Sequence, residues 1–279
     1  MLNNSRLLSF IDKNNEFTIN FVEGQKLIQD LAFIHNLKGD GFAYFRDSVL
    51  SFIPLITLLK LNENLGLYID SKSPYFLLKI EMSEHGHFRT LLLPETFEKF
   101  PKKLSGDGRL SKISVGQSSP YTSIIDINGL SFLEVVNNIL QNSYQIKGKV
   151  IISNEADQAA FIMQLPRKNW DKQEQSEAPK ELGTFLTEVD PLLKSLFSKG
   201  TNDESEVIKY FEKQDYTLLN AKDLIFKCSC SYERMISGVS SVLNTTSIDE
   251  LFKDDDSIET RCDYCKTYYQ IAKNVFLKS

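Results

Sequence analysis

The sequence has little cysteine, and all of it lies near one end. The first 227 residues contain none, and the four cysteines follow. No apolar run approaches the roughly 20 residues that span a bilayer. The segment Met1–Arg6 lacks the basic stretch, apolar core and small-residue cleavage site of a signal peptide. We therefore expect a cytoplasmic protein with no membrane partner, in which clustered cysteines are metal ligands or redox sensors rather than static disulfides.

An excess of positive charge is also absent. The formal net charge is −5, whereas a nucleic-acid binder needs clustered Lys and Arg to neutralise phosphates. No glycine-rich phosphate loop and no Ser/His/acid motif is found, so we expect no enzyme and no nucleic-acid partner. With 42% hydrophobic and 25% charged residues, the composition is that of a soluble globular protein. At 279 residues the chain can build one or two hydrophobic cores without help from the cysteines.

Short β-rich segments alternate with helical patterns in the first part of the chain. Apolar residues at helical spacing predict helices near 24–35, 42–60 and 131–140, the last with a capping box of Ser131 and Glu134. The predicted strands lie near 17–22, 66–70, 75–81, 88–93, 110–115, 122–127, 146–153 and 159–165. We therefore predict an α+β fold, with a mixed α/β sheet domain over residues 1–166.

A polar stretch follows this domain. Residues 167–180 are nearly devoid of aliphatic side chains, which predicts a linker or mobile loop. Its one large apolar residue, Trp170, either packs back on the sheet or is an exposed contact. Amphipathic helices are predicted near 181–199 and 203–214, so we assign 167–225 to a linker and helical middle region.

The cysteines form two short motifs, Cys228-Ser-Cys230 and Cys262-Asp-Tyr-Cys265. Four thiolates fill a tetrahedral zinc shell and leave no open position for water, which indicates a structural rather than a hydrolytic site. The interval between the motifs exceeds the roughly 15–20 residues of common zinc ribbons, and it has helical patterns of its own, with Met235, Val239, Val242 and Leu243 on one face.

A terminal module over 226–279 is too small for a secure core of its own. Zinc bound by a small domain contributes on the order of 10–16 kcal/mol, so loss of the metal should unfold it. Oxidation would cause that loss, because a sulfur in a disulfide or sulfenic acid is a poor ligand. The residues alone leave a static zinc site and a redox switch both open.

Histidine is scarce and offers weaker candidates. His35 falls near the end of a predicted helix, where a packing or dipole-compensating role is the simplest interpretation. His85 and His87 lie in a predicted hairpin loop, and no third ligand is near them in sequence. We interpret them as an exposed turn.

The terminal motifs resemble one family specifically. Phe226-Lys227-Cys228-Ser229-Cys230-Ser231-Tyr232-Glu233-Arg234, the acidic Asp254–Asp256, and Cys262-Asp263-Tyr264-Cys265 followed by Tyr268-Tyr269 look like the zinc-binding end of the redox-regulated chaperone heat-shock protein 33. The resemblance extends upstream through the order of strands and helices. It departs from the family's glycine-rich turns at Asp70–Pro74 and Ile127–Leu130.

The resemblance implies an ATP-independent holdase that is inactive while reduced and zinc-bound. Carried over by position, Cys228, Cys230, Cys262 and Cys265 bind one zinc ion per chain. On oxidation combined with unfolding, the family forms the pairs Cys228–Cys230 and Cys262–Cys265, releases zinc, and exposes apolar surface to unfolding client proteins. Family members dimerise, which implies a homodimer here.

Other functions stay open beside this one. A static zinc module could recognise nucleic acid or a partner protein, and Cys262-x-x-Cys265 alone could belong to a thiol oxidoreductase, although the nearby Cys-x-Cys favours a metal. The apolar residues of the 181–199 helix are candidates for a client surface, with ordinary core as the alternative. They are Leu182, Phe185, Leu186, Leu192, Leu193, Leu196 and Phe197.

Overall fold

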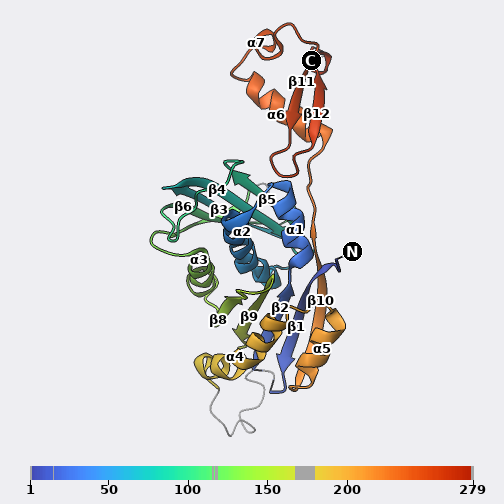
Figure 1. The fold of residues 1–279 in the computed structure, drawn as a ribbon. Helices are drawn as coiled ribbons and strands as arrows, with labels where there is room; N and C mark the ends of the chain where they lie inside the picture. The colour runs from blue at the N-terminus through green and yellow to red at the C-terminus, as the bar shows by residue number, and fades with distance from the viewer. Residues whose placement is uncertain (1, 15, 115, 117–118, 167–179, 278–279) are drawn as a thin grey trace. The chain divides into compact units, whose positions relative to one another are not determined.

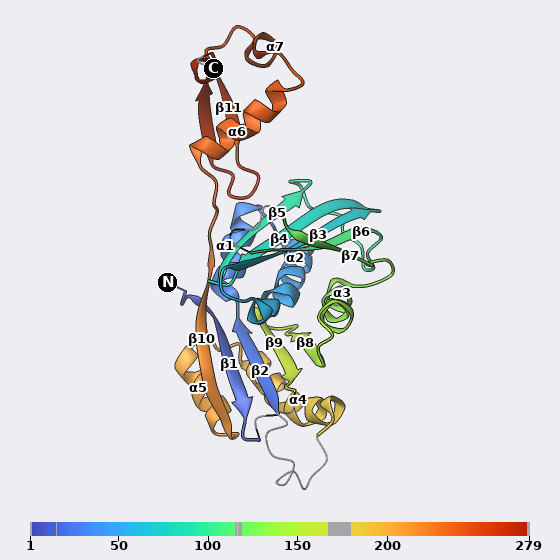
Figure 2. The same ribbon diagram turned by 180° about the vertical axis from the view of Figure 1, so that it is seen from behind.

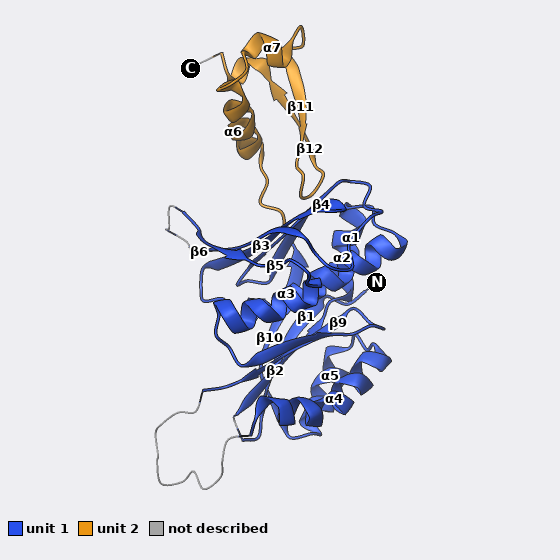
Figure 3. Ribbon diagram, turned by 90° about the vertical axis from the view of Figure 1, so that its left-hand side faces the viewer, with its two compact units in different colours: residues 1–226 blue, residues 227–279 orange. Residues whose placement is uncertain are grey.

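The chain folds as two compact units. The computed structural model describes residues 2–14, 16–114, 116, 119–166 and 180–277. The first unit spans residues 1–226 and the second 227–279, as coloured in Figure 3. Most of the predicted 167–180 linker, including Trp170, lies outside the described residues. Across the part of the chain that is described, no helix combines the length and the apolar character needed to cross a membrane.

A ten-stranded sheet forms the centre of the first unit (Figure 1), in the order β7-β6-β3-β4-β5-β10-β1-β2-β9-β8. Every strand expected between residues 17 and 165 is present, so the predicted α+β fold is confirmed; β1 and β10 were not expected. The strands are β1 (Ser5–Asp12), β2 (Phe17–Glu23), β3 (Glu63–Lys72), β4 (Tyr75–Ser83), β5 (His87–Leu93), β6 (Gly106–Ser114), β7 (Tyr121–Ile125), β8 (Gly148–Ile152), β9 (Gln158–Gln164) and β10 (Tyr216–Phe226).

Strand β10 joins the two halves of this sheet. From Tyr216 to Leu224 it pairs antiparallel with β1, with a register shift between Ser9 and Phe10 of β1. Its last two residues then pair parallel with the start of β5, Ile225 opposite His87 and Phe226 opposite Phe88. The end of the first unit is therefore tied to both halves by one strand, and to β5 by a very short pairing.

The β4–β5 turn is fitted closely against β10 through Gly86. The carbonyl oxygen of Gly86 accepts a hydrogen bond from the Ile225 N–H at 2.9 Å, and the Lys222 ammonium donates to the Glu84 carbonyl oxygen. Gly86 has φ +84°, and a Cβ there would overlap the Asp223 carbonyl oxygen and lie 3.1 Å from its carbon. Only glycine fits this position without a shift of the backbone.

Helices pack on both faces of the β1-β2-β9 part of the sheet (Figure 2). One core lies beneath α1 (Gln25–Ile34), α2 (Gly39–Phe52) and α3 (Phe132–Asn138), and the other beneath α4 (Leu182–Lys199) and α5 (Glu204–Glu212). Strand β2 is buried along its whole length because it lies between the two cores. Val22 belongs to the first core, for example, and Phe17 to the second.

The helix predictions hold, with small changes at the ends. Ser131 and Glu134 form the capping box at the start of α3, as predicted. The single helix expected over 42–60 is instead α2 followed by a 3-10 segment, η1 (Ile53–Leu58), because Pro54 has no N–H to continue the α-helical pattern. A short π-helical turn, η2 (Ile139–Ser143), extends α3.

The interpretations of His35 and His85 agree with the structure, whereas His87 does not lie in an exposed turn: it begins β5, is half-buried and pairs with Ile225 of β10. His35 caps the end of α1 and is buried, with Nε2 2.8 Å from Thr90 Oγ1, so it is a packing residue. His85 lies in the turn between β4 and β5, exposed beside Glu84. In the described residues, the one cluster of three or more close metal-ligating groups is formed by the cysteines, not by His85 and His87.

The expected middle region, 167–225, is not a compact unit in its described part. Helices α4 and α5 and strand β10 belong to the first unit, because α4 and α5 bury their apolar faces against β1, β2 and β9. The rings of Phe17 and Phe185 stack with centroids 4.0 Å apart, and those of Phe10 and Phe211 stack at 4.2 Å. Phe185, Leu193, Leu196 and Phe197 are buried, and Leu182, Leu186 and Leu192 are half-buried, so this face is core in the folded state.

The second unit consists of two helices and a two-stranded ribbon. The helices predicted between the cysteine motifs are present as α6 (Tyr232–Leu243) and α7 (Ile248–Phe252), capped by Ser231 and Ser247. The ribbon was not predicted; it pairs β11 (Ser257–Arg261) with β12 (Tyr268–Ala272), followed by η3 (Lys273–Val275). The buried apolar side chains in the described part of this unit are Val239, Phe252, Cys262 and Ile271.

Candidate metal centre

All four cysteines converge in the second unit. Cys228 and Cys230 lie in the segment between β10 and α6, and Cys262 and Cys265 lie in the turn between β11 and β12. Their four Sγ atoms lie within 4.8 Å of one another. Two close contacts join the motifs, with Cys228 Sγ 3.7 Å from Cys262 Sγ and Cys230 Sγ 3.3 Å from Cys265 Sγ. The two motifs therefore form one site, as the sequence predicts.

Local backbone structure holds each motif in place. In the second motif, the Cys262 N–H donates to the Thr267 carbonyl at 2.9 Å, and the Lys266 N–H donates to the Cys262 carbonyl at 2.8 Å. Lys266 has φ +61°, which closes the turn and starts β12. In the first motif, Cys230 directly precedes Ser231, the N-cap of α6. The start of α6 therefore fixes the backbone next to Cys230.

The thiol pKa values differ within the cluster. Burial raises the pKa of the Cys228 thiol to about 12 and also raises the pKa of the Cys262 thiol. Burial acts in the same direction on Cys265, but hydrogen bonds from the Thr267 hydroxyl and N–H outweigh it and lower the Cys265 pKa to about 7. Four thiolates in this space repel one another, so a cation is needed to keep all four ionised at neutral pH.

The donor set fits zinc. A Zn–S distance of about 2.3 Å in a tetrahedron separates neighbouring sulfurs by about 3.8 Å, and the observed 3.3–3.7 Å contacts require only small movements to reach it. Soft thiolate ligands select zinc over the hard cations that prefer oxygen. Such a shell is complete with four sulfurs, so these ligands would give a structural ion rather than a Lewis acid with an open position.

Two hydroxyl groups next to the sulfurs were not predicted from the sequence. The Tyr269 hydroxyl lies 3.0 Å from Cys230 Sγ, and Thr267 Oγ1 lies 3.2 Å from Cys265 Sγ. The hydrogen bond to Cys230 raises the pKa of Tyr269 to about 12. The alternation of side chains along a strand after Cys265 is a signal that could have placed Tyr269, and not Tyr268, on the sulfur side.

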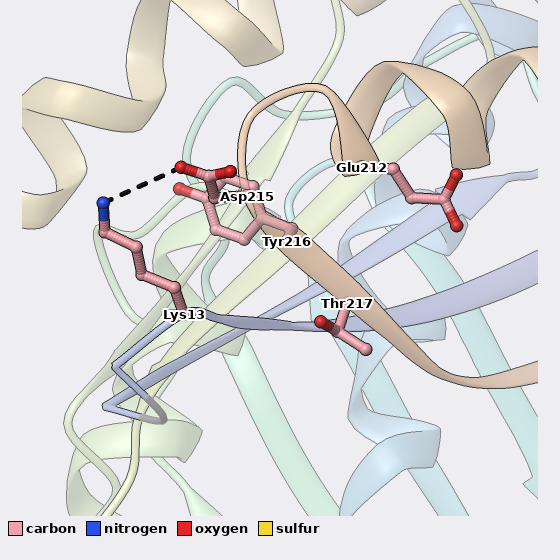
Figure 4. A pocket seen from close by; sticks show the side chains of 5 residues that line it. All are labelled: Lys13, Glu212, Asp215, Tyr216 and Thr217. Atoms are coloured by element: carbon pink, nitrogen blue, oxygen red, sulfur yellow. Dashed lines mark ion pairs between the residues drawn. The ribbon is translucent and has the colours of Figure 1, made fainter.

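A pocket elsewhere in the molecule offers little chemistry. It lies between the β1–β2 turn and the start of β10 (Figure 4). The lining residues are Lys13, Glu212, Asp215, Tyr216 and Thr217. Lys13 Nζ lies 3.7 Å from a carboxylate oxygen of Asp215, and both side chains are largely exposed, so the ion pair is weak. We assign no function to this pocket.

Comparisons with known proteins agree with this site and fold. A "33 kDa chaperonin" of Aquifex aeolicus is 19% identical over 95% of this chain and 86% of that protein. One from an Enterobacter species is 27% identical over 60% of this chain and 57% of its own length. The crystal structure of the 33 kDa chaperonin (heat shock protein 33 homologue) from Thermotoga maritima superposes with a TM-score of 0.70 over 98% of this chain and 96% of that one, at 13% identity.

The sequence model of the family described as "Hsp33 protein" matches residues 5–272. That match takes in the ten-stranded sheet and all four cysteines. The Thermotoga structure has the same fold across nearly the whole of both chains. The resemblance seen in the cysteine motifs is therefore confirmed, and this chain belongs to the Hsp33 family.

Proposed function

We propose that this chain is a redox-regulated, ATP-independent holdase chaperone that binds unfolding proteins after its metal centre is oxidised. One observation carries the proposal: the four-sulfur cluster lies in a unit whose described residues bury very little apolar surface. The names of the curated relatives support the chaperone part, and the cysteine cluster supports the redox part. By the family's pattern the protein acts in the cytoplasm, as a homodimer, with unfolding clients as its partners.

The fold of the second unit depends on its four thiolates in this proposal. Four buried apolar side chains are too few to offset the conformational entropy of ordering the residues around them. Cys228, Cys230, Cys262 and Cys265 would hold one zinc ion per chain, which supplies on the order of 10–16 kcal/mol to a small domain when bound. Conversion of these thiolates to disulfides removes that contribution and unfolds the unit.

The oxidation step is balanced with hydrogen peroxide as the oxidant. In each pair the first sulfur attacks one peroxide oxygen, the O–O bond breaks, and a sulfenic acid and hydroxide form. The second sulfur then displaces hydroxide from the sulfenic sulfur to give the disulfide, and two protons from solvent convert the two hydroxides to water. We propose the pairs Cys228–Cys230 and Cys262–Cys265, as in the family.

Client binding would draw on apolar surface that is covered in the folded state. Strand β10 runs directly into the segment that carries Cys228, so disorder in the second unit would begin where β10 ends. Helices α4 and α5 cover the β1-β2-β9 part of the sheet, and the apolar face of α4 is the candidate client surface. In this proposal residues 1–166 carry dimerisation, 167–225 respond to the switch, and 226–279 are the switch.

The decisive experiment combines metal and thiol counting with a client assay. The reduced protein should contain one zinc and four free thiols per chain. After treatment with peroxide under mildly unfolding conditions, the protein should have lost the zinc and the free thiols. Only this treated protein should suppress the light scattering of a heat-denaturing client. Peptide mapping by mass spectrometry would distinguish the proposed pairs from disulfides between the motifs, such as Cys230 with Cys265, whose sulfurs lie 3.3 Å apart.

Each outcome decides one part of the proposal. Reduced protein that contains no zinc would refute the metal centre, and equal client protection before and after oxidation would refute the switch. Tight, salt-sensitive nucleic-acid binding by the reduced protein would instead support a static zinc module. A variant with Ser in place of both Cys262 and Cys265 should protect clients without oxidant, because its second unit cannot complete the thiolate shell.

A further inference from the structure

The metal centre carries more negative charge than its ion can neutralise. Four thiolates around one Zn²⁺ leave a net charge of −2 at the ligands. Cys262 is buried, with 4% of its surface exposed, so solvent offers this part of the cluster little stabilisation. Such a cluster needs hydrogen-bond donors from side chains next to the sulfurs.

Tyr269 supplies one such donor. Its hydroxyl lies 3.0 Å from Cys230 Sγ, and a metal-bound sulfur has no proton, so the phenol must be the donor in that contact. Thr267 Oγ1 also lies close to a sulfur of the cluster, 3.2 Å from Cys265 Sγ. The sulfurs of Cys230 and Cys265 lie only 3.3 Å apart, a separation at which two thiolates repel each other strongly.

The fold explains why Tyr269, and not its neighbour, reaches the sulfur. In the antiparallel ribbon Tyr268 pairs with Arg261, and Tyr269 pairs with Thr260. Successive side chains of a strand point to opposite faces, so the two tyrosines diverge. Tyr268 is 58% exposed, with the Arg261 guanidinium 5.9 Å from its ring centre, whereas Tyr269 turns its hydroxyl to Cys230.

We propose that Tyr269 is a positioning residue of the metal centre, whose hydroxyl holds Cys230 as a metal-bound thiolate and protects it from oxidants. A hydrogen bond withdraws electron density from sulfur and so reduces its attack on the peroxide oxygen. Without that bond, Cys230 Sγ gives its electron pair to peroxide more readily, the O–O bond breaks, and sulfenic acid and hydroxide form faster. Tyr269 therefore helps to set the oxidant threshold, an inference that rests on the proposed redox function.

The test compares Tyr269→Phe with Tyr268→Phe in the full-length chain. Both variants lose one hydroxyl from adjacent positions of β12 and keep the aromatic ring, so a general effect of the substitution should appear in both. We expect Tyr269→Phe alone to bind zinc about tenfold more weakly in competition with a chelator, the lower end of the range for ligand-supporting residues. The same variant should release zinc faster when treated with a fixed concentration of peroxide.

A spectroscopic measurement separates this role from a merely structural one. With Co²⁺ in place of zinc, the sulfur-to-metal charge-transfer band should move to longer wavelength in Tyr269→Phe and stay in place in Tyr268→Phe. Unchanged affinity, release rate and band position in Tyr269→Phe would overturn the inference while the proposed function stands. Absence of zinc from the unaltered reduced protein would instead remove the proposed function itself.

Discussion

Replacing Gly86 by alanine should loosen the end of β10, the strand that leads into the unit with the four cysteines. Gly86 combines two constraints, a φ of +84° and a position where an added Cβ would overlap the Asp223 carbonyl oxygen. Gly129 provides a matched control, since its φ is +74° and an added Cβ would meet nothing within 4 Å. Alanine at either position has the same backbone strain, about 1–2 kcal/mol.

Any destabilisation of Gly86→Ala beyond that of Gly129→Ala comes from the contact of the added Cβ with the Asp223 carbonyl. A Cβ that overlaps the Asp223 oxygen must push the turn away from β10, which breaks the 2.9 Å hydrogen bond from the Ile225 N–H and the two-residue pairing with β5. The lost hydrogen bond costs about 1 kcal/mol and the forced shift of packed groups about 1–3 kcal/mol. Gly86→Ala should therefore be destabilised by about 2–4 kcal/mol more than Gly129→Ala.

Two measurements test this difference. Urea unfolding followed by circular dichroism gives the free energies of unfolding of both variants, and amide hydrogen exchange reports on Ile225 directly. We expect the Ile225 amide to exchange faster in Gly86→Ala only. Equal destabilisation of the two variants, with unchanged exchange at Ile225, would refute the claim that the turn holds the end of β10.

Three further predictions concern pH, capping and the core of the second unit. Burial raises the pKa of Glu23 to about 7. Between about pH 4.5 and 7 the folded protein therefore binds more protons than the unfolded chain. As the pH rises through that window, the contribution of Glu23 to the free energy of unfolding falls by up to about 3 kcal/mol. Glu23→Gln should consequently melt at a higher temperature than the parent at pH 8, and the exposed control Glu98→Gln should not. Asp203→Ala removes the oxygen that accepts the Ser205 N–H at 2.8 Å at the start of α5 and should cost about 1 kcal/mol in urea unfolding, whereas Asp203→Asn should cost little. Phe252→Ala removes one of the few buried side chains of the second unit, a loss of about 3–5 kcal/mol of stability. In the presence of a chelator, circular dichroism should therefore show this unit unfolding at a lower temperature in Phe252→Ala than in the exposed control Val242→Ala. Equal sensitivity of the two variants to the chelator would contradict the small-core argument.

Local patterns in the sequence were sufficient to predict much of the fold and the cysteines that come together in the candidate site. The capping box at Ser131 and the cap at Asp203 act within one helical turn, so they can be read without knowledge of distant partners. Strands β3 to β5 bury alternate residues, which gives them a clear period of two. The cysteine spacing likewise predicts that four sulfurs can meet at one ion.

Strands β1 and β10 were missed for a physical reason. Leu7 and Leu8 of β1 point into different cores, so the strand is apolar on both faces and has no alternation to detect. Along β10 every side chain except that of Leu224 is half-buried or exposed, and the partners of this strand are more than 120 residues away in sequence. Pairing over such separations is set by the whole fold rather than by local propensity.

The sequence by itself determined which atoms are the candidate ligands of a metal ion, because ligand type and spacing are local properties of the chain. Only the tertiary structure decided what surrounds those atoms. The β11–β12 register turns Tyr269 toward Cys230 and Tyr268 toward solvent, and the Gly86 turn ties the end of β10 to β5. Both arrangements depend on segments that meet only after folding, because the strands around them must pair before either contact can exist.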